Sequence, residues 1–279
     1  MRSLFVALAA FASLLALAQA DKDAYYGAGA FTHEGITIPY RELALNQEIP
    51  GLSCLVVQLH GGTARGNDNK AQLVAAAVDS VERFLEENRV KAIFVLPQCG
   101  SDRVWNESRR SYPITMTDVV AAWINDYISS HDIAPDAVFL TGYSAGGSGA
   151  WRLANDQPGM FAAAVIAAAN PLMVTEANVK ETPIFAVAGS DDTIMDAEKI
   201  KTFAQSLLAL GAEVRFNLLE GKDHFGTCDE AFTSNRLGWL LGHAKVITGN
   251  TPITGDVNGD GIVNGTDVTA LYNILLNGD

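Results

Sequence analysis

The stretch that most constrains the fold lies near the middle of the chain. Three apolar residues, Val138 to Leu140, lead into Gly142-Tyr-Ser144-Ala-Gly146, and residues that suit a helix follow. This order predicts a strand, a tight turn and a helix, with Ser144 on the turn. Flanking glycines let the strand and the helix pass closely, and the turn sets the hydroxyl beside the free N–H groups of the helix. We interpret Ser144 as a nucleophile; the alternative is a Gly- and Ser-rich surface loop.

Apolar runs and amphipathic stretches alternate along most of the chain. We expect strands near residues 36–40, 52–59, 91–96, 137–141, 161–168, 183–188 and 213–219. We expect helices near residues 71–87, 117–130, 196–210 and 229–241. This alternation is typical of the α/β class, with a mainly parallel sheet and helices on both faces. Ligands of such sheets bind at the carboxyl ends of the strands, where the motifs of this chain also fall.

A serine hydroxyl needs a base to act at neutral pH, and the base needs a carboxylate. His224 is the candidate base, because it directly follows a predicted strand and precedes a predicted helix. Of the other four histidines, His33 precedes the core, and His60 belongs to a Gly-rich loop where its expected role is structural. His131 and His243 lie at helix ends. We expect the acid in the loop after the 183–188 strand, where Asp191 and Asp192 both qualify and Asp196 ranks third as a helix-starting residue.

The negative oxygen of a tetrahedral intermediate needs preorganised N–H donors. Ala145, the residue after the candidate nucleophile, supplies one. The second is expected from His60-Gly-Gly-Thr63, after the 52–59 strand, with Gly62 or Thr63 as the donor. Glycines in that loop let the backbone approach a substrate oxygen closely.

The first twenty residues have the pattern of a signal peptide. Arg2 gives a positive start, residues 4–17 are almost wholly apolar, and Ala18-Gln19-Ala20 is a small-x-small cleavage site. We expect a protein secreted to the extracellular or periplasmic space and matured near Asp21. No other stretch is long enough to span a membrane, so none is expected to hold the mature protein.

Charge and cysteine content limit the choice of partners. With 19 Lys and Arg against 32 Asp and Glu, the net charge of −13 disfavours nucleic acid as a partner. Three cysteines allow one disulfide at most. Cys54 and Cys99 fall in or beside predicted core strands and are expected to be buried, whereas Cys228 near His224 could end a bridge.

The tail changes in composition after a catalytic domain at 21–243 and a linker at 244–254. Within residues 255–279, the loop that starts at Asp256 matches a calcium-binding loop, with Gly261 at the turn. Its expected ligands of a structural Ca²⁺ are Asp256, Asn258, Asp260, the carbonyl of Ile262, and Asp267. The alternative is an Asn-, Asp- and Gly-rich surface turn.

Four motifs in register carry a family resemblance: residues 59–69, residues 142–151, residues 189–194, and His224 with residues 229–232. Together they resemble secreted α/β-hydrolase esterases of the polyhydroxybutyrate-depolymerase and feruloyl-esterase type, including carboxylesterases once labelled predicted peptidases. The resemblance implies an α/β-hydrolase fold, ester hydrolysis without a cofactor, and Ser144, Asp192 and His224 as nucleophile, acid and base.

The tail resembles one dockerin repeat, of a family that has two, which implies a cohesin-type protein partner and esters on plant cell-wall polysaccharide, feruloyl or acetyl, as substrates. Polyester depolymerase and serine peptidase remain alternatives on the same fold. A non-catalytic module tethered by its dockerin is the alternative from another class.

Overall fold

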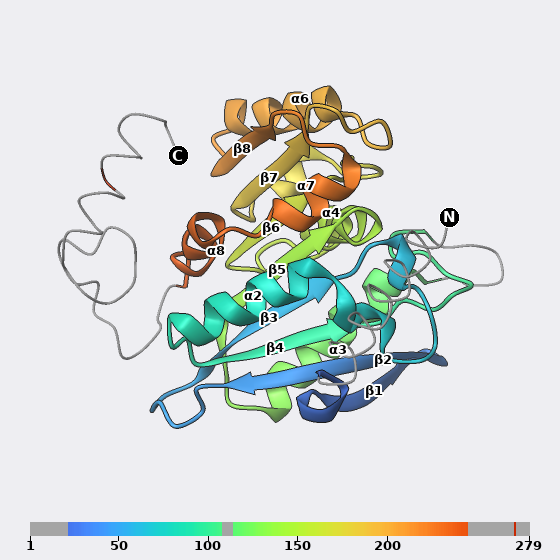
Figure 1. The fold of residues 1–279 in the computed structure, drawn as a ribbon, viewed down its shortest axis with the longest axis vertical. Coiled ribbons are helices and arrows are strands. Elements are labelled where there is room, and N and C mark those ends of the chain that lie inside the picture. The colour runs from blue at the N-terminus through green and yellow to red at the C-terminus, as the bar shows by residue number, and fades with distance from the viewer. Residues whose placement is uncertain (1–21, 108–113, 245–270, 272–279) are drawn as a thin grey trace, which may run out of the picture.

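Eight strands form a single sheet in the computed structural model, which describes residues 22–107, 114–244 and Leu271 (Figure 1). The strand order is β1-β2-β4-β3-β5-β6-β7-β8. Their bounds are β1 (Gly27–His33), β2 (Ile36–Leu45), β3 (Ser53–Leu59), β4 (Ala92–Pro97), β5 (Ile133–Tyr143), β6 (Ala163–Ala167), β7 (Ile184–Gly189) and β8 (Val214–Leu219). The pairs β1–β2 and β2–β4 are antiparallel and every other pair is parallel, which confirms the predicted α/β class.

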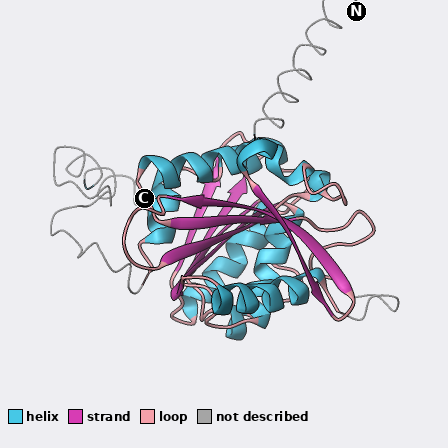
Figure 2. Cartoon of the chain, turned by 90° about the horizontal axis from the view of Figure 1, so that it is seen from below, coloured by secondary structure: helices cyan, strands magenta, loops and turns pink. Residues whose placement is uncertain are grey.

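Helices cover both faces of the sheet (Figure 2). They are α2 (Ala76–Glu87), α3 (Met116–Ser130), α4 (Ala145–Asp156), α5 (Glu176–Val179), α6 (Ala197–Ala209), α7 (His224–Glu230) and α8 (Ser234–Leu241), with 3-10 turns η1 (Gly62–Ala64) and η2 (Ala71–Val74). Helices α3, α4 and α6 pack on one face and α2, α7 and α8 on the other. Among the described residues, no helix has both the length and the apolar character needed to cross a bilayer.

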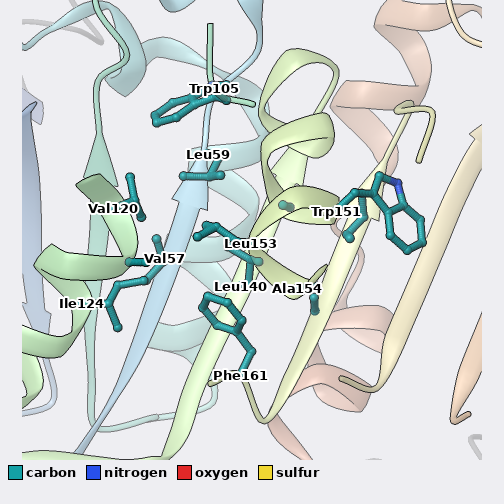
Figure 3. Close-up of a cluster of buried hydrophobic side chains, with 14 of the residues drawn as sticks. Val57, Leu59, Trp105, Val120, Ile124, Leu140, Trp151, Leu153, Ala154 and Phe161 are labelled. Atoms are coloured by element: carbon teal, nitrogen blue, oxygen red, sulfur yellow. The ribbon is translucent and has the colours of Figure 1, made fainter. Parts of the chain in front are cut away.

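The central strands are apolar on both sides because both faces are covered. All seven residues of β3 are buried, with Val57 facing one helix layer and Val56 the other. Figure 3 shows the first layer, where Val57 and Leu140 of the sheet meet Ile124 of α3 and Leu153 of α4. This rigid core holds the carboxyl ends of the strands in place.

Three helix predictions need correction. The helix expected from residue 117 begins at Met116, because Thr115 caps it and forms a capping box with Asp118. The helix expected over 71–87 starts as the 3-10 turn η2 and becomes α-helical only after the extended Ala75. The helix expected over 229–241 is two helices, α7 and α8, because the chain is extended at Thr233 between them.

The three cysteines are all buried and none forms a disulfide. Burial of Cys54 and Cys99 agrees with the prediction, and Cys228 is not the end of a bridge. Burial raises the pKa of each thiol to about 12, so each is a neutral, small apolar group at physiological pH.

Candidate active site

Ser144 lies on a sharp turn between β5 and α4, as the sequence predicts. Its backbone is held at φ +54° and ψ −124°, a conformation that residues with a Cβ rarely adopt. Its N–H donates to the carbonyl of Ala167 on the neighbouring strand at 3.0 Å. A Cβ on Gly142 would lie 2.6 Å from the Gly146 carbonyl oxygen, and one on Gly146 would lie 2.0 Å from that of Leu59. The two glycines are therefore required for strand and helix to pass this closely.

His224 reaches Ser144 from the first residue of α7. The distance between its Nε2 and the Ser144 Oγ is 2.8 Å, although the two residues are 80 positions apart in the chain. Asp223 fixes the start of α7, because its Oδ1 accepts the N–H of Gly226 at 2.8 Å. The sequence places His224 in a loop, whereas the structure places it in a helix, so its ring is positioned by helix geometry.

A close contact between two loops brings His224 to its carboxylate. A Cβ on Gly189, at the end of β7, would lie 2.1 Å from the Thr227 Oγ1 and 2.4 Å from the Lys222 carbonyl oxygen. Only glycine therefore lets the loop after β7 pack against the start of α7. The sequence motif 189–194 contains this glycine, but its partner 38 residues further on cannot be read from the motif.

Asp192 is the carboxylate that contacts His224. Its Oδ2 lies 2.8 Å from the His224 Nδ1, and its Oδ1 accepts the N–H groups of Ile194 and Met195, both at 2.8 Å. The side chain is only 2% exposed. Of the other two candidates, Asp191 accepts the hydroxyl of Ser190 and Asp196 caps α6 through the N–H groups of Glu198 and Lys199.

This arrangement fixes the tautomer of His224. Because Asp192 accepts hydrogen bonds from two backbone N–H groups, its carboxylate is an acceptor toward the imidazole as well. The proton of the neutral imidazole is therefore on Nδ1, and Nε2 has a free lone pair that faces the Ser144 hydroxyl. The geometry is that of a hydroxyl ready to lose its proton to a base.

Two of the three candidate N–H donors belong to residues next to Ser144 or its neighbour, namely Ala145 and Gly62. Ala145 is the first residue of α4 and Gly62 is the first of η1, so neither N–H has a partner within its own helix. A Cβ on Gly62 would lie 3.9 Å from the Ala145 Cβ, and one on the neighbouring Gly61 would lie 3.5 Å from the Ser144 Cβ. Thr63 follows in η1 and is exposed.

His60 holds this loop against the core. Its Nε2 accepts the N–H of Cys99 at 3.0 Å, its Nδ1 lies 2.7 Å from the Gly61 carbonyl, and its own carbonyl accepts the indole N–H of Trp105 at 3.0 Å. Because Nε2 is an acceptor, the ring is neutral with its proton on Nδ1. Burial lowers the pKa of His60 to about 4. The sequence points to a structural role for His60 but does not reveal that Cys99 and Trp105 are its partners.

This shift predicts a pH dependence of stability. The pKa of His60 is about 4 in the fold and 6.5 in its absence, so between pH 6.5 and 4 the unfolded chain takes up this proton and the folded chain does not. The free energy of unfolding should fall as pH drops from 6.5 to 4, by up to about 3 kcal/mol. Urea unfolding of the wild type and of His60→Gln across this range measures the effect. A difference between the two proteins that stays constant with pH would contradict it.

No group of three or more His, Cys, Asp or Glu within the described ranges could hold a metal ion. The predicted signal peptide, most of the predicted linker and the predicted calcium ligands Asp256, Asn258, Asp260, Ile262 and Asp267 lie outside the described residues.

The mainly parallel sheet, the strained turn at Ser144 and the chain order Ser144, Asp192, His224 define an α/β hydrolase. Residues 98–236 match the Dienelactone hydrolase family. A comparison with curated protein sequences finds no match.

Solved structures share this fold. A thermostable esterase superposes with a TM-score of 0.69 and 23% identity over 78% of this chain, and this chain spans only 63% of that one. A ferulic acid esterase superposes with a TM-score of 0.60 and 14% identity, and the match covers 79% of this chain and 97% of that chain. An S-formylglutathione hydrolase from Staphylococcus aureus superposes with a TM-score of 0.58 and 15% identity, and the match covers 77% of this chain and 98% of that chain. The different substrates in the names of these proteins show that the fold alone does not define the ester.

Proposed function

We propose that the protein is a secreted serine carboxylesterase with Ser144, His224 and Asp192 as its catalytic residues. One observation carries the proposal: the continuous chain of 2.8 Å contacts from the Ser144 Oγ through the His224 imidazole to the Asp192 carboxylate. A part-buried serine–histidine–carboxylate chain beside two helix-starting N–H groups has the parts that acyl transfer needs.

In the first half of the reaction, the Ser144 Oγ attacks the ester carbonyl carbon while the His224 Nε2 takes the hydroxyl proton. The carbonyl electron pair moves onto oxygen, where the N–H groups of Ala145 and of Gly62 or Thr63 stabilise the charge. The intermediate then breaks its bond to the alcohol oxygen, which receives the proton from His224. Asp192 holds the Nδ1 proton and stabilises the imidazolium throughout.

In the second half, water takes the place of the alcohol. His224 removes a proton from water as its oxygen attacks the acyl-enzyme carbonyl, and the new intermediate releases the carboxylic acid with return of the proton to Ser144. No cofactor is needed for either step. The chain therefore supplies every group that the reaction requires.

The substrate class of the proposal is an ester on plant cell-wall polysaccharide, with a feruloyl or acetyl group. It rests on the likeness of the motifs to esterases of this type and on the dockerin-like tail, and one of the superposed structures is titled a ferulic acid esterase. Assays on methyl ferulate, acetylated xylan and p-nitrophenyl acetate test it, with a short polyhydroxybutyrate oligomer and a peptide amide as the competing substrates. Turnover of the peptide but none of the esters would overturn the proposal.

The proposed role of the C-terminal tail is to bind one Ca²⁺. The calcium-loaded tail then binds a cohesin-type partner. The spacing of Asp256, Asn258 and Asp260 supports this, since a hard cation prefers several oxygens from one loop. Calcium titration of the full chain with cohesin present, against the Asp256→Ala, Asp260→Ala variant, tests it. Equal calcium uptake by both proteins would argue against the site.

A further inference from the structure

Several of the most exposed large apolar side chains of the described residues lie in three segments: the loop after β6, the loop after β7 and the start of α7. Met173 is 66% exposed, Phe225 62% and Ile194 58%, and Leu172, next to Met173, is 50% exposed. None of these side chains is needed to cover the sheet, because helices already cover both of its faces. Single exposed apolar residues are common, but several around one site indicate a binding surface.

These three segments follow β6, β7 and β8, at the same edge of the sheet as Ser144. Phe225 is adjacent to His224, and the centres of their rings are 5.6 Å apart in an edge-to-face arrangement. Ile194 donates its N–H to Asp192. The apolar side chains are thus attached directly to the residues that form the candidate catalytic chain.

The loop after β6 is tied to the same site. Ala167, the last residue of β6, accepts the N–H of Ser144, and the Asn170 Oδ1 accepts the N–H of Asp196 at 3.1 Å. Ala168 and Met173 are both held at positive φ, of +47° and +60°, which non-glycine residues rarely adopt. The loop that presents Leu172 and Met173 is therefore set in one shape beside the nucleophile.

A depression of about 470 Å³ lies between the loops after β6 and β7. Its lining includes Asn170 from the loop after β6, Asp192, Ile194 and Met195 from the loop after β7, and the start of α6. The depression has a volume in the range of small-molecule sites. Ile194, Met195 and Ala197 are the apolar members of a mostly polar lining, so the depression can take a ligand with both apolar and polar parts.

We infer that Leu172, Met173, Ile194 and Phe225 form an apolar rim that binds the acyl group of the ester and selects bulky apolar acyl groups over acetyl. The inference rests on the proposed function. The alcohol of the proposed substrate is a sugar hydroxyl, which is polar, so the apolar part of the ester must be its acyl group. Aromatic and medium-length aliphatic acyl groups share the chemistry that such a rim binds, since Phe and Met pack well against either.

The test is the ratio of kcat/KM for p-nitrophenyl octanoate to that for p-nitrophenyl acetate. In the wild type the ratio should exceed about 10, because a longer acyl group buries more apolar surface on the rim. The double variant Ile194→Ala, Phe225→Ala should lower the ratio about tenfold, because the acetyl group is too short to depend on the rim. The variant keeps the backbone N–H of Ile194 that bonds to Asp192.

A matched control uses Leu208 and Leu210, which are 53% and 55% exposed at the end of α6. Leu208→Ala, Leu210→Ala removes comparable exposed apolar surface and should leave the ratio unchanged. Methyl ferulate against methyl acetate repeats the comparison for an aromatic acyl group; a loss there but not with octanoate would identify the aromatic group as the one bound.

Two outcomes overturn the inference. One is a wild type that hydrolyses acetate at least as well as octanoate and ferulate. The other is a rim variant that loses activity on short and long acyl groups equally. Absence of hydrolysis of every ester by the wild type is a different failure, because it overturns the proposed function itself.

Discussion

Replacing Ser144 by alanine is expected to lower kcat on p-nitrophenyl acetate by about 10⁵- to 10⁶-fold, with the same loss on every ester that the wild type hydrolyses. The substitution removes the oxygen that would form the acyl-enzyme, so no step of the proposed reaction can proceed through it. Only the N–H donors and the binding surface remain, and these give a small residual rate. Stopped-flow and steady-state hydrolysis measure the loss, and a fluorophosphonate that labels the wild type should not label the variant.

Alanine is the informative replacement because it keeps the Cβ and therefore the backbone constraint at φ +54°. The melting temperature of Ser144→Ala should stay close to that of the wild type. Ser148→Ala makes the same change one turn further along α4 and should keep kcat within about threefold, as substitutions that leave the reacting groups in place do. Activity of Ser144→Ala within tenfold of the wild type would contradict a covalent role for Ser144.

The fold and the position of Ser144 on its turn could be predicted because their signals are local. An apolar run that ends in Gly142-Tyr-Ser144-Ala-Gly146 specifies a strand, a turn and a helix within 15 residues. His224 could be selected among five histidines because it follows a strand. The place of His224 at the first position of α7 could not be predicted, because it depends on capping by Asp223 and on packing of this segment against Gly189.

Long-range contacts set what the sequence left open. Asp191 and Asp192 are neighbours of the same type, and only the shape of the loop decides which one faces His224. The partners of His60 lie 39 and 45 positions away, in a stretch with no recognisable motif. The apolar rim is equally hidden, because Met173, Ile194 and Phe225 look like ordinary core residues until the structure places them at the surface.

The replacement Asp192→Asn is expected to lower kcat about ten-thousand-fold, although it changes only one atom. The Oδ1 position accepts the N–H groups of Ile194 and Met195, so the amide oxygen of asparagine must occupy it. The amide NH₂ then faces the His224 Nδ1 and donates to it, which moves the ring proton to Nε2. The His224 Nε2 then presents an N–H donor to the Ser144 hydroxyl instead of a lone pair. His224 can therefore no longer take the hydroxyl proton.

Asp191→Asn is the matched control, since it makes the same change one residue earlier and affects only the contact with Ser190. It should keep kcat within about threefold of the wild type, as expected of an exposed polar substitution. ¹⁵N spectra of the imidazole ring should show the proton on Nδ1 in the wild type and on Nε2 in Asp192→Asn. If Asp191→Asn were the inactive variant and Asp192→Asn the active one, the acid would be the neighbouring residue. If both stayed active, His224 would not need a carboxylate, and the tautomer argument would fail with it.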